Sequence, residues 1–337
     1  MRKAFTLLAV LALLLTTVVV VLGGYVRLSD AGLGCPDWPG CYGQLAVPSD
    51  DEVAARAGFD RPLESGKAWR EMIHRYAAGT LGLLVLALAV LATLNRRHDA
   101  SQPLVLPWLL VVLIIFQSLL GMLTVTWLLK PLIVMGHLLG GLTTLALLGL
   151  LVLRRLPLAE PTPAVRPHRG LAVAAALGLM LLVGQIALGG WTSANYAAMA
   201  CPDFPQCQGQ WWPHTDFGEA FTLWRGLGTD YEFGVLDSPA RTAIQVTHRL
   251  GALTLALYFA TFLTLLLRRE RDVVRRRWAV AVGLALLVQI SLGITTVLSH
   301  LSLPVAAAHN AGAAMLLLAL VGLNYALWNN EPRLSLP

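Results

Sequence analysis

The stretch CPDWPGCYGQ at residues 35–44 returns as CPDFPQCQGQ at residues 201–210, an offset of 166 residues. The same offset separates the preceding GGY at 23–25 from GGW at 189–191. Further along, a His-Arg pair recurs at an offset of 174, and later matches settle at 172. Self-similarity at a nearly constant spacing is typical of a duplicated fold. Small changes in the offset indicate loop insertions between two halves that follow the same course.

The composition places both halves in a membrane. The 337 residues are 56% hydrophobic and 13% charged, with a mean hydropathy of +0.66, which is more apolar than a soluble domain needs. A bilayer core about 30 Å thick needs about 20 apolar residues for each helical crossing. Eight stretches qualify, at 5–24, 72–94, 104–128, 132–153, 170–190, 244–267, 278–298 and 304–328. The sequence therefore predicts an all-α integral membrane protein with eight transmembrane helices.

Four of these stretches fall in each half. Short connections favour antiparallel neighbours, so the expected architecture is two tandem four-helix bundles. Four crossings return the chain to its starting side, and both halves then have the same orientation. We expect an N-terminal bundle over residues 1–155, a cytoplasmic linker at 156–169 and a C-terminal bundle over 170–337.

Basic residues gather in alternate loops. With the amino terminus in the cytoplasm, the loops on that side contain 15 of the 25 Lys and Arg residues but only five of the 19 acids. The positive-inside rule then places both termini in the cytoplasm and the long loops at 25–71 and 191–243 on the periplasmic side of a bacterial inner membrane. The net charge of +6 reflects this topology. It predicts contact with membrane lipid and gives no indication of nucleic acid.

All four cysteines lie in the two outward loops, as Cys35 and Cys41 in the first and Cys201 and Cys207 in the second. An oxidising compartment permits a disulfide in each loop. The C-x5-C spacing matches the C-x2-C of zinc ribbons poorly, so the sequence favours disulfides over metal binding by these thiols. Structural and redox-active disulfides both remain open from the residues alone.

Four of the eight histidines recur at matching places near the outer start of a membrane stretch: His74, His137, His248 and His309. Ionisable residues at membrane depth are costly, and they usually face a bundle interior and mark a functional site. A single histidine of this kind more often only forms a hydrogen bond to a neighbouring helix. A duplicated pair at a common depth favours a role as a metal ligand. Two imidazoles suit haem iron, whereas zinc needs three or four protein ligands. We therefore predict one haem site in each half.

Two further repeated pairs flank these histidines. Arg75 and Arg249 directly follow their histidines at the outer interface. Their guanidinium groups either pair with a haem propionate in a bidentate geometry or extend to the interface as ordinary interfacial arginines, and both interpretations stay open. Gln117 and Gln289 are expected to form hydrogen bonds between helices.

The repeat breaks at Glu71, which lies three residues before His74 and aligns with Gln245. Positions i and i+3 share a helix face, so a haem held by His74 would bring its rim near this carboxylate. There Glu71 would transfer a proton or stabilise developing positive charge. The alternative is an interfacial ion pair with Arg70 or Arg75. We infer that the N-terminal half performs chemistry and that the C-terminal half holds an electron-transfer haem.

Together these features resemble haem A synthases of the respiratory-oxidase assembly pathway over nearly the whole chain. The similarity rests on Glu71-x-x-His74, the three later histidines and a cysteine pair in each outer loop. It implies oxidation of the C8 methyl of haem O to a formyl group through haem I. It also implies a haem b bound by His248 and His309, with the substrate haem O near His74 and His137. In the family, the first cysteine pair has been suggested to pass reducing equivalents or help haem transfer.

The resemblance further implies haem O synthase and cytochrome oxidase assembly factors as partners. A homo-oligomer is compatible with the sequence, which has no signature for it. Two other functions also use four histidines. A di-haem electron carrier of the cytochrome b561 type explains them but not the difference between Glu71 and Gln245, or the paired cysteines. A haem transporter or chaperone shares every feature and differs only in turnover.

Overall fold

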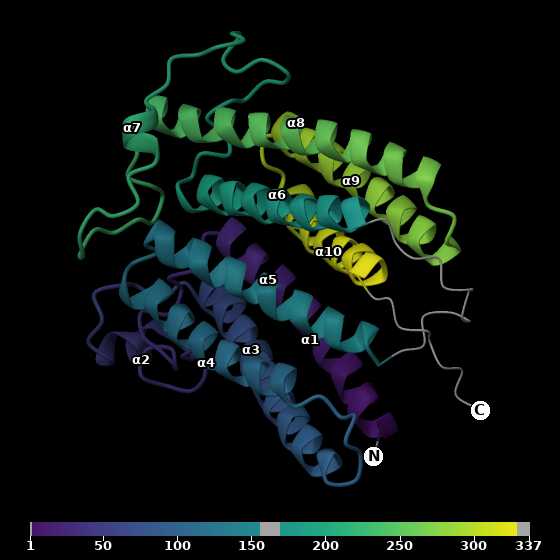
Figure 1. The fold of residues 1–337 in the computed structure, drawn as a ribbon. Helices are drawn as coiled ribbons and strands as arrows, with labels where there is room; N and C mark the ends of the chain where they lie inside the picture. Colours follow the sequence, from purple (N-terminus) through teal and green to yellow (C-terminus); the bar gives the residue numbers. More distant parts are fainter. Residues whose placement is uncertain (1, 156–168, 329–337) are drawn as a thin grey trace.

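Eight long helices make up most of the computed structural model, which describes residues 2–155 and 169–328 (Figure 1). All eight are long and apolar enough to cross a membrane, as the sequence predicted. In the N-terminal half they are α1 (Arg2–Leu28), α3 (Ser65–Arg96), α4 (Val105–Thr126) and α5 (Pro131–Leu153). In the C-terminal half they are α6 (Arg169–Ala194), α8 (Ser238–Arg269), α9 (Val273–Leu298) and α10 (Leu303–Trp328). Two short helices, α2 (Asp51–Arg56) and α7 (Phe217–Ala220), lie in the long loops.

The two helices that begin furthest before their apolar runs are α3 and α8. The predicted stretch at 72–94 belongs to a helix that starts at Ser65, and the stretch at 244–267 to one that starts at Ser238. In the second case the carboxylate of Asp237 accepts a hydrogen bond from the Ala240 amide at 3.0 Å and caps a polar first turn. Apolar length locates only the part of a helix that lipid surrounds, so it misses such turns.

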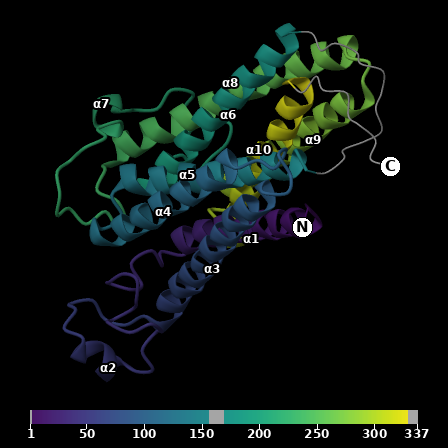
Figure 2. The same ribbon diagram turned by 60° about the horizontal axis from the view of Figure 1, so that its bottom comes forward.

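The helices of each half pack as a closed set of four. In the first half α1 and α4 each pack against α3 and α5, and in the second α6 and α9 each pack against α8 and α10. The two sets lie beside each other in both views (Figures 1 and 2). This is the packing expected of two four-helix bundles. The domain boundaries stay a prediction, because residues 156–168 of the expected linker lie outside the described residues.

The two halves meet where α10 packs against α1 and α5, and where α5 packs against α6. The contacts here are close, because a β-carbon built on Gly24 would lie 2.8 Å from the Asn310 amide nitrogen. The repeat-related contact has the same distance, between Gly190 and a methyl group of Leu138. Small residues allow helix backbones to approach inside a membrane, where van der Waals contact replaces the hydrophobic effect as the driving force. The interface therefore brings together α5 and α10, the helices that bear His137 and His309.

Both disulfide loops lie at the end of the molecule where α1 and α6 finish (Figure 1). The arginine pairs at 96–97, 154–155 and 268–269 lie at the opposite helix ends. The structure thus separates the cysteine loops from the arginine-rich turns, as the predicted topology requires.

A segment of the second outer loop, residues 221–236, crosses to the first half, and we call it the strap. The buried ammonium group of Lys130 lies 3.3 Å from the ring centroid of Trp224 and donates to the Gly226 carbonyl oxygen. The amide of Tyr231 donates to the Leu128 carbonyl at 3.0 Å. An ion pair joins Arg61 to Glu232 at 2.7 Å. The repeat offset grows from 166 to 174 between the cysteines and the next histidine, and the strap lies in this enlarged loop.

Replacing Trp224 with alanine should destabilise the protein, because the buried Lys130 ammonium group would lose its nearer aromatic ring and keep only that of Trp127, 5.9 Å away. We expect a loss of about 1–2 kcal/mol in unfolding free energy, seen as a lower Tm in detergent. Trp211→Ala is the matched control, since this tryptophan in the same loop is 74% exposed. Equal losses in both variants would show that the cation–π contact does not hold the strap.

Candidate haem sites

The first histidine pair faces across the N-terminal set of helices. His74 of α3 and His137 of α5 have ring centroids 6.5 Å apart and ring planes at 88°. With a metal–nitrogen bond of about 2 Å on each side, this separation accommodates one iron between the rings. The second pair consists of His248 of α8 and His309 of α10, at the positions that the repeat aligns with the first pair. These two rings are close enough to interact electrostatically. The structure thus brings the four predicted ligands together as two pairs.

Each histidine ring lies against a glycine of a neighbouring helix. A β-carbon on any of these glycines would come within 3.0–3.4 Å of an imidazole Cε1 atom, which is tighter than ordinary contact. Any larger side chain would therefore displace the ring. The pairs are Gly23 with His74, Gly121 with His137, Gly189 with His248 and Gly293 with His309. In the sequence these glycines marked the repeat, and only the packing of α1 on α3 and its equivalents reveals their contact with the rings.

The polar atoms left over at both sites fit a haem. The Nδ1 atoms of His74, His137 and His309 are buried without a hydrogen-bond partner, as are both amide atoms of Gln117. Among residues 2–155 and 169–328, no three His, Cys, Asp or Glu side chains gather closely enough to hold a metal. Paired imidazoles with unused nitrogen atoms suit axial ligation of a planar iron group better than a compact metal site.

Glu71 lies one turn outward of His74 and is only 5% exposed. Its Oε2 atom accepts from the Cys35 amide at 2.9 Å, and its Oε1 atom accepts from Arg75 at 2.5 Å. The ion pair of the alternative interpretation is therefore present, in a buried setting. The aligned Gln245 is equally buried, and its Oε1 atom has no partner. The carboxylate thus connects the first disulfide loop to the helix that bears His74.

The two arginines hold the disulfide loops by their backbone. Arg75 donates to the carbonyl oxygens of Asp37 at 2.9 Å and of Pro39 at 3.3 Å. Arg249 donates to the carbonyl oxygens of Cys201, Asp203 and Gln206 at 2.7–2.9 Å. The Nε atom of Arg249 is buried without a partner, which leaves one donor for a propionate. Propionate binding by these arginines stays a prediction.

Both expected disulfides are present, Cys35 with Cys41 and Cys201 with Cys207. In the second loop the Asp203 carboxylate accepts from the Gln208 amide at 2.6 Å and the Gly209 amide at 2.8 Å. Gly209 has a φ of +72°, which favours glycine in this turn. The Gly209 amide, followed by that of Gln208, lowers the pKa of Asp203.

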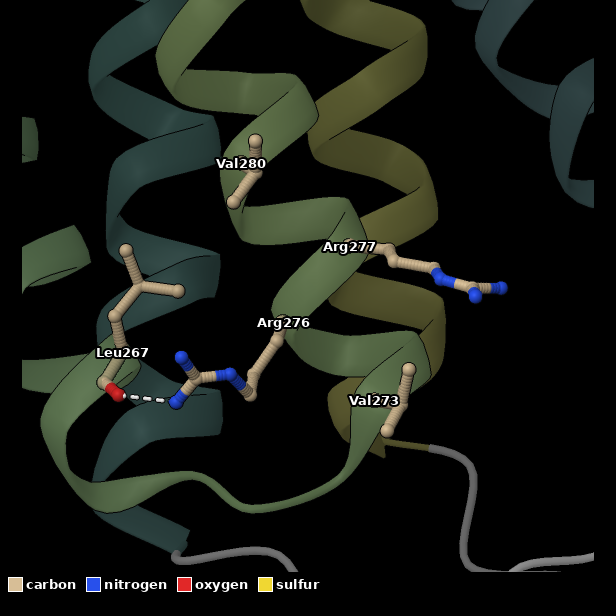
Figure 3. Close-up of a pocket in the computed structure, with 5 residues that line it drawn as sticks. All are labelled: Leu267, Val273, Arg276, Arg277 and Val280. Carbon is tan, nitrogen blue, oxygen red and sulfur yellow. Dashed lines mark hydrogen bonds between the residues drawn. The ribbon is translucent and has the colours of Figure 1, made fainter.

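One pocket of the described residues lies away from the histidines. It has a volume of about 340 Å³ and sits at the turn between α8 and α9, at the end opposite the disulfide loops (Figure 3). Arg276 lines it and donates to the Leu267 carbonyl at 2.6 Å. A pocket walled by aliphatic side chains and arginine has no group for redox chemistry, so the histidine pairs remain the candidate sites.

Acid should loosen the second disulfide loop. Because folding lowers the pKa of Asp203, its contribution is complete above the ordinary value of 3.8 and is lost as the pH falls through the folded value. Hydrogen exchange of the Gln208 and Gly209 amides is measured from pH 6 down to about pH 3. Its rate should fall less than the intrinsic exchange rate does, which is an acceleration relative to the intrinsic pH trend. In Asp203→Asn this additional acceleration should be absent. An identical pH profile in the parent and the variant would contradict the assignment.

Comparison with known proteins agrees with this arrangement. The family described as cytochrome oxidase assembly protein matches residues 6–321. A heme A synthase of Shewanella oneidensis is 47% identical over 334 residues, which cover 96% of this chain and 97% of that protein. A heme A synthase of Caulobacter vibrioides is 31% identical and covers 88% of both chains. Another, of Paracoccus denitrificans, is 29% identical and covers 94% of this chain and 85% of the relative. The chain belongs to the family of cytochrome oxidase assembly proteins.

Proposed function

We propose that this protein is a haem A synthase, a membrane oxidoreductase that converts haem O to haem A. In this reaction the C8 methyl group of haem O is oxidised to a formyl group by way of haem I. The substrate lies between His74 and His137, and a resident haem b lies between His248 and His309. The observation that supports this division is the break in the repeat: two equivalent histidine pairs differ in the buried carboxylate of Glu71 and the buried amide of Gln245.

Glu71 is positioned to act at the rim of the substrate. Its two oxygen atoms are fixed by the Cys35 amide and the Arg75 guanidinium group, so the carboxylate cannot turn away from the histidine-bearing face of α3. A fixed negative charge stabilises positive charge that develops on a nearby carbon, and the same group can accept the proton that the methyl carbon loses. Gln245 has the same shape without the charge and cannot do either.

The C-terminal pair has the features of a resident cofactor site. A haem b held there would supply one-electron transfer. His248 and His309 would hold it, and Gln245 is neutral where the first site has the carboxylate of Glu71. The contacts of Gly24 with Asn310 and of Gly190 with Leu138 bring the two halves close together, which supports a short path for electrons between the proposed sites.

The surroundings of the protein follow from the same assignment. We infer that the arginine-rich helix ends face the cytoplasm and that the disulfide loops face the periplasm of a bacterial inner membrane. The expected partners are haem O synthase, which supplies an insoluble substrate, and cytochrome oxidase assembly factors, which receive the product. Haem O and haem A are too apolar to diffuse freely through water, so transfer by contact is the simplest route.

Identification of the bound haems tests the proposed function. The protein is purified from membranes that also make haem O, its non-covalent haems are extracted in acid, and their masses are measured. Haem b together with haem I or haem A, with or without remaining haem O, is the expected result. Haem b alone would contradict the synthase assignment and favour an electron carrier of the cytochrome b561 type, whereas haem O without any oxidised product would favour a transporter or chaperone.

Glu71→Gln should stop product formation while leaving the haem sites intact. Removal of a positioned acid–base group lowers rates by about 10²–10⁴-fold, so haem O should accumulate at the expense of haem A. Gln245→Ala is the matched change in the other half and should still give haem A. The roles of the two halves would be reversed if Glu71→Gln kept product formation and Gln245→Ala abolished it. The readout is the haem composition of purified protein.

A further inference from the structure

The turn between α8 and α9 contains a pocket, and the repeat gives this turn a counterpart between α3 and α4. At the offset of 174 residues Leu267 aligns with Thr93. At the offset of 172 residues Val280 aligns with Trp108. In the first half the Trp108 indole reaches from α4 to α3 and donates to the Thr93 hydroxyl at 3.1 Å. In the second half an isopropyl group stands at the indole position and lines a pocket of about 340 Å³.

One face of α9 forms most of the pocket wall (Figure 3). The spacing i, i+3, i+4 and i+7 places four lining residues on this face, and they are Val273, Arg276, Arg277 and Val280. Leu267 of α8 completes the wall. The pocket therefore combines an aliphatic surface with two guanidinium groups.

The two arginines are a second difference between the halves. Arg276 and Arg277 align with Leu104 and Val105, so two aliphatic side chains of the first half are replaced by two cations. The space left by the indole and the added positive charge thus occur at the same turn. Either change alone would leave an apolar groove or an ordinary basic turn, whereas both together form a place for a ligand that is apolar at one end and anionic at the other.

The acids of this turn do not neutralise the two arginines. The Glu270 carboxylate is buried, pairs with Arg275 at 3.2 Å and accepts from the Asp272 amide at 3.0 Å. The Asp272 carboxylate accepts from the Arg275 amide at 2.9 Å and caps α9. The Arg276 guanidinium group donates to backbone carbonyl oxygens only. That of Arg277 extends to the other side of α9 (Figure 3), and it takes part in none of the ion pairs among the described residues.

The position of the pocket along the helices matches the edge of a bilayer. Both α8 and α9 are long and apolar enough to cross a membrane, and the pocket lies where one ends and the other begins. Val273 and Val280 are 52% and 47% exposed, so the aliphatic part of the wall is open to its surroundings. At this depth the surroundings are lipid head groups and the first carbons of acyl chains. Basic pockets between membrane helices bind anionic head groups.

We propose that this pocket binds one anionic phospholipid. Arg276 and Arg277 hold the phosphate, and the start of an acyl chain lies against Val273 and Val280. The lipid joins the ends of α8 and α9, as the bond between Trp108 and Thr93 joins α4 and α3. The inference goes beyond the proposed function and requires only that α8 and α9 cross a membrane.

Native mass spectrometry of the full chain in detergent tests the charge requirement, with dioleoyl phosphatidylglycerol and dioleoyl phosphatidylcholine as the probes. The parent should retain one phosphatidylglycerol and bind phosphatidylcholine more weakly. Arg276→Gln/Arg277→Gln should weaken phosphatidylglycerol binding by about 25-fold, which is about fivefold for each arginine. Arg268→Gln/Arg269→Gln is the matched control, because it removes the same charge from the end of α8 outside the pocket, and it should bind like the parent. Equal losses in the two variants, or equal binding of both lipids by the parent, would overturn the proposal.

A second variant tests the pocket itself and leaves every arginine in place. Leu267→Thr/Val280→Trp copies the pair of the first half and should fill the space with an indole. Phosphatidylglycerol binding should then weaken by about fourfold for each acyl methylene that loses its contact. An unchanged affinity would overturn the proposal.

Inorganic phosphate distinguishes a lipid site from a site for any small anion. A large excess of phosphate, added to the parent with its bound phosphatidylglycerol, should leave the lipid in place, because phosphate has no acyl chain to contact the aliphatic wall. Complete displacement of the lipid by phosphate would show an unspecific anion site and would overturn the proposal.

Discussion

An imidazole packed onto a glycine of the next helix is the contact on which the rest of this structure depends. It occurs four times, and each occurrence requires two helices to approach closely at one membrane depth. A polar ring at that depth is tolerated only where it faces the protein interior, so the helices must close around it. The small residues at the interface between the halves meet the same requirement, since Gly24 and Gly190 leave room for the Asn310 and Leu138 side chains of the facing helices.

Duplication supplies two equivalent histidine pairs, and in the proposed function the departures from symmetry divide the work between them. Near the C-terminal pair the distinctive side chains are neutral amides, at Gln185, Gln245 and Asn310. The positions related by the repeat in the first half are Val19, Glu71 and Leu138. At these three positions the first site therefore has a carboxylate and two aliphatic side chains, and the second has three amides. In the proposed function these differences separate a reactive site from a retained cofactor.

Much of the fold and of the candidate sites was predictable from the sequence because the membrane restricts the fold. Apolar length located all eight helices, and the repeat identified the four histidines, the cysteine pairs and the break at Glu71. The contact of Lys130 with Trp224 was not predictable, since these residues are far apart in the chain and have no repeated counterparts. The arginine contacts with loop carbonyls were also missed, because a guanidinium group bonds to carbonyl oxygens and carboxylates alike and the sequence does not distinguish them. The contact of the Gln185 amide with His248 was also missed. The repeat aligns Gln185 with Val19, which is apolar, so the repeat did not mark this position.

The most direct test of the central claim is a structure of the protein determined by electron cryo-microscopy with haem O supplied. The account predicts one macrocycle between His74 and His137 with its C8 methyl group toward Glu71, and a second between His248 and His309 without a farnesyl chain. A haem O bound at the C-terminal pair, or at a site away from all four histidines, would contradict it.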